Sequence, residues 1–172
     1  MSIDVILQDP RWGEDLTELA EAAFAQTLSH LALAPDDWEV ALLACSDAQI
    51  AKLNAQFRNK AAATNVLSWP SSERGAKTAG QKPDAPSGDP ELGDIAIAYE
   101  TCLKEARAGG RTLQDHTTHL IVHGILHLLG YDHERSGDGD LMEATEIAIL
   151  AKLSVGDPYG GESHETDLMR KG

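Results

Sequence analysis

Three histidines in the second half of the chain have the spacing of a metal site. They lie in the segment HGILHLLGYDH, which begins at His123, contains His127 and ends at His133. On a helix, the first two are four residues apart and project from the same face. Gly130 suits the end of that helix, where a chain reversal would bring the third histidine back. Three neutral imidazoles around zinc leave a fourth position for water, which is typical of a catalytic site.

The segment matches the zinc-peptidase pattern H-E-x-x-H-x-x-G-x-x-H except at one position. Gly124 stands where those peptidases carry the glutamate that takes a proton from the metal-bound water. Because glycine has no titratable atom, this departure disfavours peptidase chemistry. In the structural alternative the histidines only pack or cap an apolar helix, but that interpretation suits a single histidine better than three at ligand spacing.

Other polar residues flank these three histidines. His119 lies one turn before His123, about 6 Å along a helix axis, and either supports a ligand or transfers a proton. His116 is one position off this stripe, and we expect it to face solvent. Asp132 either orients a ligand imidazole through a hydrogen bond or serves as a turn residue.

Three sequence blocks together resemble a known family. They are LNAQFRNKAAATNVLSWP at 53–70, LGDIAIAYE at 92–100 and the histidine block. In this order they are similar to the YbeY family of bacterial metal-dependent endoribonucleases, over roughly residues 38–153. The resemblance implies a zinc-dependent RNase specific for single strands, which acts in maturation of ribosomal RNA, notably at the 3′ end of the small-subunit RNA, and in ribosome quality control. Asn65 stands where the family more usually has aspartate, so this chain lacks a charge there.

The resemblance also implies roles for single residues. The family's metal ligands fall on His123, His127 and His133, and its functionally important arginine falls on Arg58. An arginine beside a metal can hold two phosphate oxygens and neutralise charge that develops in the transition state. With Arg58 as this phosphate clamp, either His119 or the metal-bound hydroxide itself handles the proton. Zinc is the expected ion, although imidazole ligands also accept other divalent transition metals.

The charge of the chain is uneven along its length. The 28 acids and 14 bases give a formal charge of −14, which disfavours non-specific adhesion to nucleic acid. Residues 1–50 hold 10 acids and 1 base, and residues 112–172 hold 11 and 4, whereas residues 51–111 hold 7 and 9. We therefore expect single-stranded RNA, as part of a ribosome or small subunit, to run over the middle third. The bases named for this path are Arg58, Lys60, Arg74, Lys77, Lys82, Arg107 and Arg111.

Length and composition favour one domain at 1–153 and a disordered tail at 154–172. No apolar run approaches the roughly 18 residues of a membrane span, and the N-terminus has no secretory signal pattern. Cys45 and Cys102 are isolated and read as reduced core residues. We expect a cytoplasmic protein with neither a membrane nor DNA as partner.

Apolar periodicity predicts an α/β fold with a mixed four-stranded sheet, about five helices and a metal cleft formed by a helix-turn segment. The strands are expected at 3–7, 38–45, 64–69 and 92–99, and the helices at 16–31, 46–57, 101–108, 113–129 and 139–153. A hairpin-like connection across the loop 70–90 would supply one antiparallel strand, and the bases of this loop make it a candidate RNA flap. In the last helix, Met142 is expected in the core and Glu146 at the surface.

Three functions fit these observations. The first is the metal-dependent single-strand endoribonuclease. The second is a zinc peptidase-like hydrolase whose base has moved elsewhere, which would cleave unstructured polypeptide and leave RNA intact. The third is a non-catalytic ribosome-associated protein whose metal braces the fold. The absent glutamate at Gly124 counts equally for the first and the third.

Overall fold

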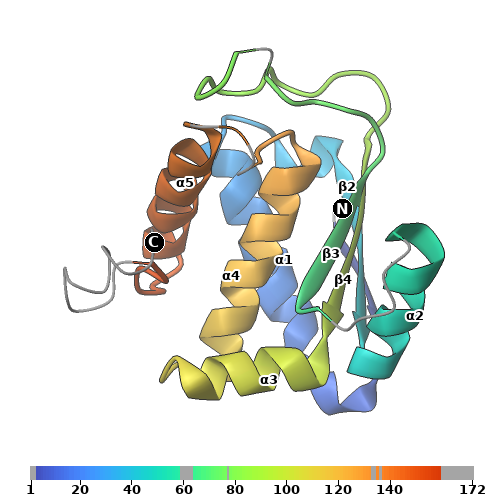
Figure 1. Ribbon diagram of the computed structural model, residues 1–172. Coiled ribbons are helices and arrows are strands. Elements are labelled where there is room, and N and C mark those ends of the chain that lie inside the picture. Colours follow the sequence, from blue (N-terminus) through green and yellow to red (C-terminus); the bar gives the residue numbers. More distant parts are fainter. Residues whose placement is uncertain (1–2, 59–63, 77, 133–134, 136, 160–172) are drawn as a thin grey trace.

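The computed structural model describes residues 3–58, 64–76, 78–132, 135 and 137–159, with the side chains of Phe57 and Arg58 excepted. Within these residues, an α/β fold contains a four-stranded mixed sheet and five α-helices (Figure 1). The strands are β1 (Ile3–Leu7), β2 (Glu39–Cys45), β3 (Val66–Pro70) and β4 (Glu91–Ala98). The helices are α1 (Asp15–His30), α2 (Asp47–Arg58), α3 (Tyr99–Ala108), α4 (Leu113–Leu128) and α5 (Asp138–Lys152). The expected fold class is confirmed, and two short 3-10 turns, Pro10–Trp12 and Pro35–Asp37, add to it.

The strand order is β1-β2-β4-β3. The first three of these strands are parallel, and β3 runs antiparallel to β4 with Val66 opposite Ile97. The long connection from β3 to β4 therefore acts as the expected wide hairpin. Alternate side chains of β2 lie on opposite faces, so that Val40, Leu42 and Ala44 join the main core.

Helices α1 and α4 cover the inner face of the sheet, with α3 and α5 packed against α4 (Figure 1). The Thr112 hydroxyl caps α4 by accepting the Asp115 amide at 3.0 Å. Gly124 lets α4 approach the sheet closely, because a Cβ there would lie 3.0 Å from the Ile95 Cδ1 atom. The sheet thus supports α4, the helix that carries the histidines, through close packing.

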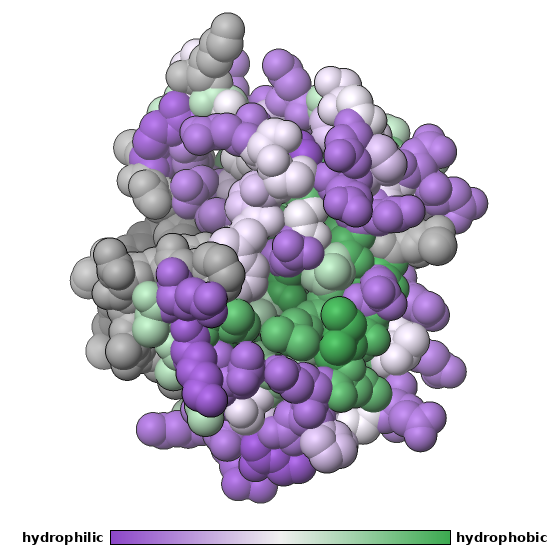
Figure 2. All heavy atoms as spheres, turned by 90° about the vertical axis from the view of Figure 1, so that its right-hand side faces the viewer, coloured by the Kyte–Doolittle hydropathy of each residue, from purple (hydrophilic) through white to green (hydrophobic). Residues whose placement is uncertain are grey.

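The outer face of the sheet is only partly covered. Helix α2 packs over it through Ile50, and its start is capped by Ser46, whose hydroxyl accepts the Gln49 amide at 3.2 Å. Beside α2 lies a hollow of about 430 Å³ whose lining includes Ile6 and Trp69. Figure 2 shows the corresponding apolar area on this side of the molecule, surrounded by hydrophilic residues.

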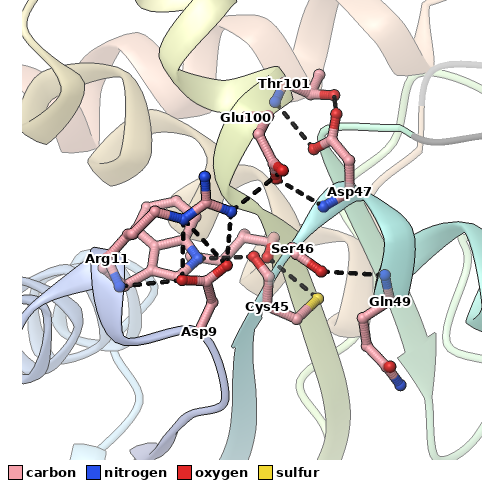
Figure 3. Close-up of polar contacts among 10 residues, drawn as sticks. Asp9, Arg11, Cys45, Ser46, Asp47, Gln49, Glu100 and Thr101 are labelled. Atoms are coloured by element: carbon pink, nitrogen blue, oxygen red, sulfur yellow. Dashed lines mark hydrogen bonds and ion pairs between the residues drawn. The ribbon is translucent and has the colours of Figure 1, made fainter.

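Charged side chains close the carboxyl end of the three parallel strands (Figure 3). Arg11 follows β1, pairs with Asp9 at 2.7 Å and with Glu100 at 3.1 Å, and stacks over the Tyr99 ring at 4.6 Å. Asp47 follows β2 and accepts both the amide and the hydroxyl of α3 residue Thr101. These contacts tie together the segments that follow β1, β2 and β4.

Several further expectations can be compared with the described residues. Cys45 and Cys102 are free and buried, and burial raises their pKa values to about 11 and about 12, respectively, as expected for reduced core thiols. Of the described helices, none has the length and apolar character needed to span a membrane. The tail boundary after residue 153 stays a prediction, because only residues 154–159 of that tail are described.

Candidate metal centre

A row of histidines follows one side of α4. The ring centroids of His119 and His123 are 6.3 Å apart, and those of His123 and His127 are 6.4 Å apart. Each step is one helical turn, so the row follows from the i, i+4 spacing alone. His123 and His127 thus stand beside each other, as the sequence predicts, whereas His133 lies outside the described residues.

A buried carboxylate from α5 holds this row. Glu146 has no exposed surface, and its Oε2 atom lies 2.6 Å from Nδ1 of His123. Its Oε1 atom lies 3.0 Å from Nε2 of His119. The expectation that Glu146 faces solvent is therefore wrong. It occupies the buried stripe of α5 with Met142 and Ile149, and an acid at such apolar spacing is the sequence signal that points to this position.

The chain returns to the site after α5. The hydroxyl of Tyr159 donates to Glu146 Oε1 and lies 3.1 Å from Nε2 of His119. Arg111, next to the start of α4, holds this returning segment by donating to the Pro158 carbonyl at 2.6 Å. The sequence gives no signal for Tyr159, since its contact depends on the path of the chain beyond α5.

These contacts govern the charge of Glu146. Burial alone would raise the pKa of this carboxyl group, but hydrogen bonds from His119 and His123 outweigh burial and lower the pKa to about 2. The carboxylate is therefore ionised at neutral pH and accepts a hydrogen bond from His123 Nδ1. This contact places Nε2, the other ring nitrogen of His123, on the side of the ring away from the carboxylate.

A cleft of about 680 Å³ opens at the end of α4. Its lining includes His127, Asp132 and residues 70–76. Asp132 Oδ1 lies 3.7 Å from His127 Nε2, a separation that suits an ion pair but exceeds a hydrogen bond. The cleft therefore exposes one of the proposed ligands to a substrate.

Two residues shape the turn below the cleft. Gly130 has a φ of 104°, and a Cβ on it would lie 2.3 Å from the Arg74 carbonyl oxygen. The Arg74 guanidinium donates to the Leu128 carbonyl at 2.8 Å and to the Leu92 carbonyl at 3.2 Å, so it ties the end of α4 to β4. Glycine is thus required both by its backbone conformation and by the close approach of the loop.

The loop between β3 and β4 is attached to α5 as well. The Gly80 amide donates to Asp138 Oδ1 at 2.7 Å, and Arg135 binds the other oxygen of Asp138 at 2.6 Å. Both contacts lower the pKa of Asp138. In its described part, the loop therefore contacts the end of α4 and the start of α5. Its residues 70–76 form one wall of the cleft.

Two expectations about charge need revision. His116 was expected to face solvent, but its Nε2 atom lies 2.8 Å from Glu105 Oε1 and its side chain is 12% exposed. Of the bases expected along the RNA path, Arg74 and Arg111 are partly buried and donate to backbone carbonyl groups of the protein itself. The side chain of Arg58, the proposed phosphate clamp, lies outside the described part, as do Lys60 and Lys77.

The donor set fits a metal ion such as zinc. Two imidazoles stand one turn apart on a rigid helix, and Glu146 orients one of them so that Nε2 can serve as a ligand. Within the described residues, no group of three or more histidine, cysteine or acidic side chains is arranged to hold a metal. The proposed third ligand, His133, is not among those residues.

Known proteins match nearly the whole chain. A family model described as Endoribonuclease YbeY matches residues 7–154. A relative from Jannaschia sp. (strain CCS1), named Endoribonuclease YbeY, is 53% identical and covers 92% of this chain and 100% of its own length. One of the same name from Bartonella quintana (strain Toulouse) is 44% identical, covering 92% and 97%.

The fold has a counterpart among solved structures. The solution structure of a Thermotoga maritima protein matches with a TM-score of 0.55 and 20% identity, covering 94% of this chain and 98% of that one. At this identity the likeness concerns the fold alone. The resemblance found in the three sequence blocks is confirmed by the family model and the relatives. The chain therefore belongs to the endoribonuclease YbeY family.

Proposed function

We propose that this protein is a metal-dependent endoribonuclease that cuts single-stranded RNA in the cytoplasm. Its proposed role is maturation of ribosomal RNA, at the 3′ end of the small-subunit RNA, and ribosome quality control in contact with the small subunit. Relatives named Endoribonuclease YbeY that share about half of its residues support the reaction class. The structural observation that carries the proposal is His123, held by Glu146 at 2.6 Å beside His127.

Three histidines form the proposed metal site. His123 and His127 project from one side of α4, and His133 follows the turn at Gly130. A bound zinc ion, or another divalent transition metal, would supply Lewis acidity at the scissile phosphate. The protein positions these side chains through the packing of α4 against the sheet.

Two other residues complete the proposed machinery. Arg58, the last residue of α2, would hold two phosphate oxygens in its planar guanidinium. His119 remains the proposed proton-transfer group. Because its Nε2 atom contacts both Glu146 and Tyr159, a proton on that nitrogen would belong to a shared hydrogen-bonded cluster.

The environment of Gly124 supports RNA cleavage over peptidase chemistry. This residue faces Ile95 of the sheet, and an added Cβ would meet three atoms of that side chain at 3.0–3.3 Å. A glutamate at this position would have to displace the sheet contact before it could serve as a base. The peptidase alternative therefore needs a base from another part of the chain.

The proposal is tested with purified protein on a single-stranded RNA and on an unstructured polypeptide. RNA should be cut and polypeptide left intact, with activity lost to a chelator and restored by zinc. His123→Ala should lose both metal and cleavage, whereas Arg58→Ala should keep its metal and lose cleavage. Because contaminating RNases are a hazard, each variant is purified in parallel with the parent protein.

Other outcomes would select the other functions. Cleavage of the polypeptide alone would select the peptidase. Metal binding without cleavage of either substrate would select the ribosome-associated binding protein. Cleavage by Arg58→Ala at the parent rate would reject the phosphate clamp but leave the reaction class intact.

A further inference from the structure

Glu146 is a buried charge that the proposed reaction does not itself consume. Its carboxylate has no exposed surface and receives three donors, His123 Nδ1, His119 Nε2 and the Tyr159 hydroxyl. These donors come from α4 and from the segment after α5. Burying a carboxylate costs free energy, which hydrogen bonds and nearby positive charge can offset.

The carboxylate lacks a permanent cation among the described residues. Among the same residues, His119 and His123 lie within ion-pair distance of it, with separations of 3.0 and 2.6 Å. A divalent ion bound to Nε2 of His123 would place positive charge on the side of that ring away from Glu146, one imidazole ring from the carboxylate. Such an ion would add to the hydrogen bonds in offsetting the cost of burying this acid.

A second histidine–carboxylate pair on α4 provides a contrast. His116 turns its Nε2 atom to Glu105 at 2.8 Å, and the Glu105 side chain is 41% exposed. His123 turns Nδ1 to its acid, and that acid is fully buried. The two acids thus bind opposite ring nitrogens, and in the His123 pair the acid lies on the side of the ring away from Nε2, the nitrogen farther from the backbone.

We propose that Glu146 and Tyr159 are positioning residues for the metal. Glu146 fixes His123 in the form protonated on Nδ1, and the Tyr159 hydroxyl holds the carboxylate in place from the side of the returning chain. Glu146 also makes the His123 ring a stronger donor to the ion. This inference rests on the proposed function, because it requires His123 to be a metal ligand.

The test measures metal affinity rather than RNA cleavage. Zinc is removed from the full chain with a chelator, and its dissociation constant is measured by competition with a chromophoric chelator. Cobalt replaces zinc in a parallel sample, since its visible absorption reports the geometry of the site. Glu146→Gln keeps the shape of the side chain but removes its charge, and should weaken zinc binding by about 10–100-fold and alter the cobalt spectrum.

Glu105→Gln is the matched control. It changes the His116–Glu105 pair and should leave zinc affinity and the cobalt spectrum at their parent values. Tyr159→Phe removes only one hydroxyl and should weaken zinc binding by roughly fivefold, in line with one hydrogen bond. Because it keeps the aromatic ring, it serves as the second test if Glu146→Gln does not fold. Circular dichroism checks that each variant is folded.

The outcomes separate this inference from the proposed function. Parent-like zinc affinity in folded Glu146→Gln, or in Tyr159→Phe when the former does not fold, overturns the positioning role, provided that His123→Ala loses its metal. Parent-like zinc affinity in His123→Ala instead overturns the ligand set, and the inference with it. A weakened Glu105→Gln would also count against the inference, because the effect would then not be specific to Glu146.

Discussion

Charged and polar side chains cluster in two regions, the carboxyl end of the parallel strands and the histidine row of α4. The two clusters differ in the partners that these side chains have. At the carboxyl end, Arg11 forms ion pairs with Asp9 and Glu100 (Figure 3). Asp47 accepts hydrogen bonds from the amide and the hydroxyl of Thr101. Along α4, Glu105 binds Nε2 of His116 and Glu146 binds Nδ1 of His123, so the acids there contact imidazole rings and not a permanent cation.

This difference locates function in the molecule. The carboxyl end of a parallel sheet is where α/β folds commonly bind ligands, yet here its charges neutralise one another. The histidine row ends at His127, which lines an open cleft. The two regions contain similar types of residue. They differ in the hydrogen-bond and ion-pair partners of their side-chain nitrogen and oxygen atoms. Substitutions at the carboxyl end should therefore affect stability alone, and those along α4 should affect metal binding.

The largest effect is expected at the turn below the cleft. Gly130→Ala forces a non-glycine residue to a φ of 104° and places a Cβ 2.3 Å from the Arg74 carbonyl. The free energy of unfolding should fall by about 2–4 kcal/mol, as measured in urea, and zinc affinity should fall with it. Gly110→Ala is the control, because Gly110 also has a positive φ but an added Cβ meets no atom within 4 Å. Equal losses in the two variants would show that the loop contact contributes nothing.

An intermediate effect is expected where the two regions meet. Asn65 donates its side-chain amide to Glu105 at 3.0 Å, and Glu105 also binds His116. Asn65→Asp would place two carboxylates face to face and lower stability by about 1–2 kcal/mol. Glu105→Gln should recover most of this loss in the double variant, as measured by a double-mutant cycle. Additive losses would argue against direct repulsion.

The smallest effect is expected at the carboxyl end. Arg11→Met should lower the melting temperature slightly and leave zinc affinity and RNA cleavage unchanged, with Lys104→Met, at an exposed lysine of α3, as control. A changed zinc affinity would contradict the separation of the two regions.

The Arg11 contribution should also depend on pH. Hydrogen bonding to Arg11 lowers the pKa of Asp9, and the Asp47 amide together with Arg11 lowers that of Glu100, from ordinary values of 3.8 and 4.5. Groups with a lowered pKa in the folded state stabilise it above the ordinary value and lose this effect as the pH falls through the folded value. The stability difference between the parent and Arg11→Met should therefore be full above about pH 4.5 and shrink in more acidic solution. A constant difference down to strong acid would reject the ion pairs as its source.

Local patterns predict the elements well and their contacts less well. Each strand lies within two residues of its expected position, because apolar alternation marks a half-buried strand directly. Gly130 likewise marks the end of α4 through its local conformation. The burial of Glu146 was missed, since its partners lie on another helix, although its spacing on α5 carried the signal.

The use of arginines was equally hard to predict. A loop arginine reads as a solvent-exposed base, and the carbonyl groups that Arg74 binds come from the ends of β4 and α4. Tyr159 could not be assigned from sequence because nothing local fixes where the chain goes after α5. Sequence therefore located the histidine row, and tertiary contacts identified which groups orient it.

The position of Tyr159 in the chain has a consequence for biosynthesis. Tyr159 follows every described helix and strand, so a growing polypeptide contains α4 and Glu146 before it contains the hydroxyl that covers them. Domains begin to fold as they emerge from the ribosome, N-terminal parts first. A nascent chain would thus assemble its sheet and helices while the carboxylate still lacks one of its donors. Firm retention of an ion would come as a late step of maturation, after the surrounding architecture has formed.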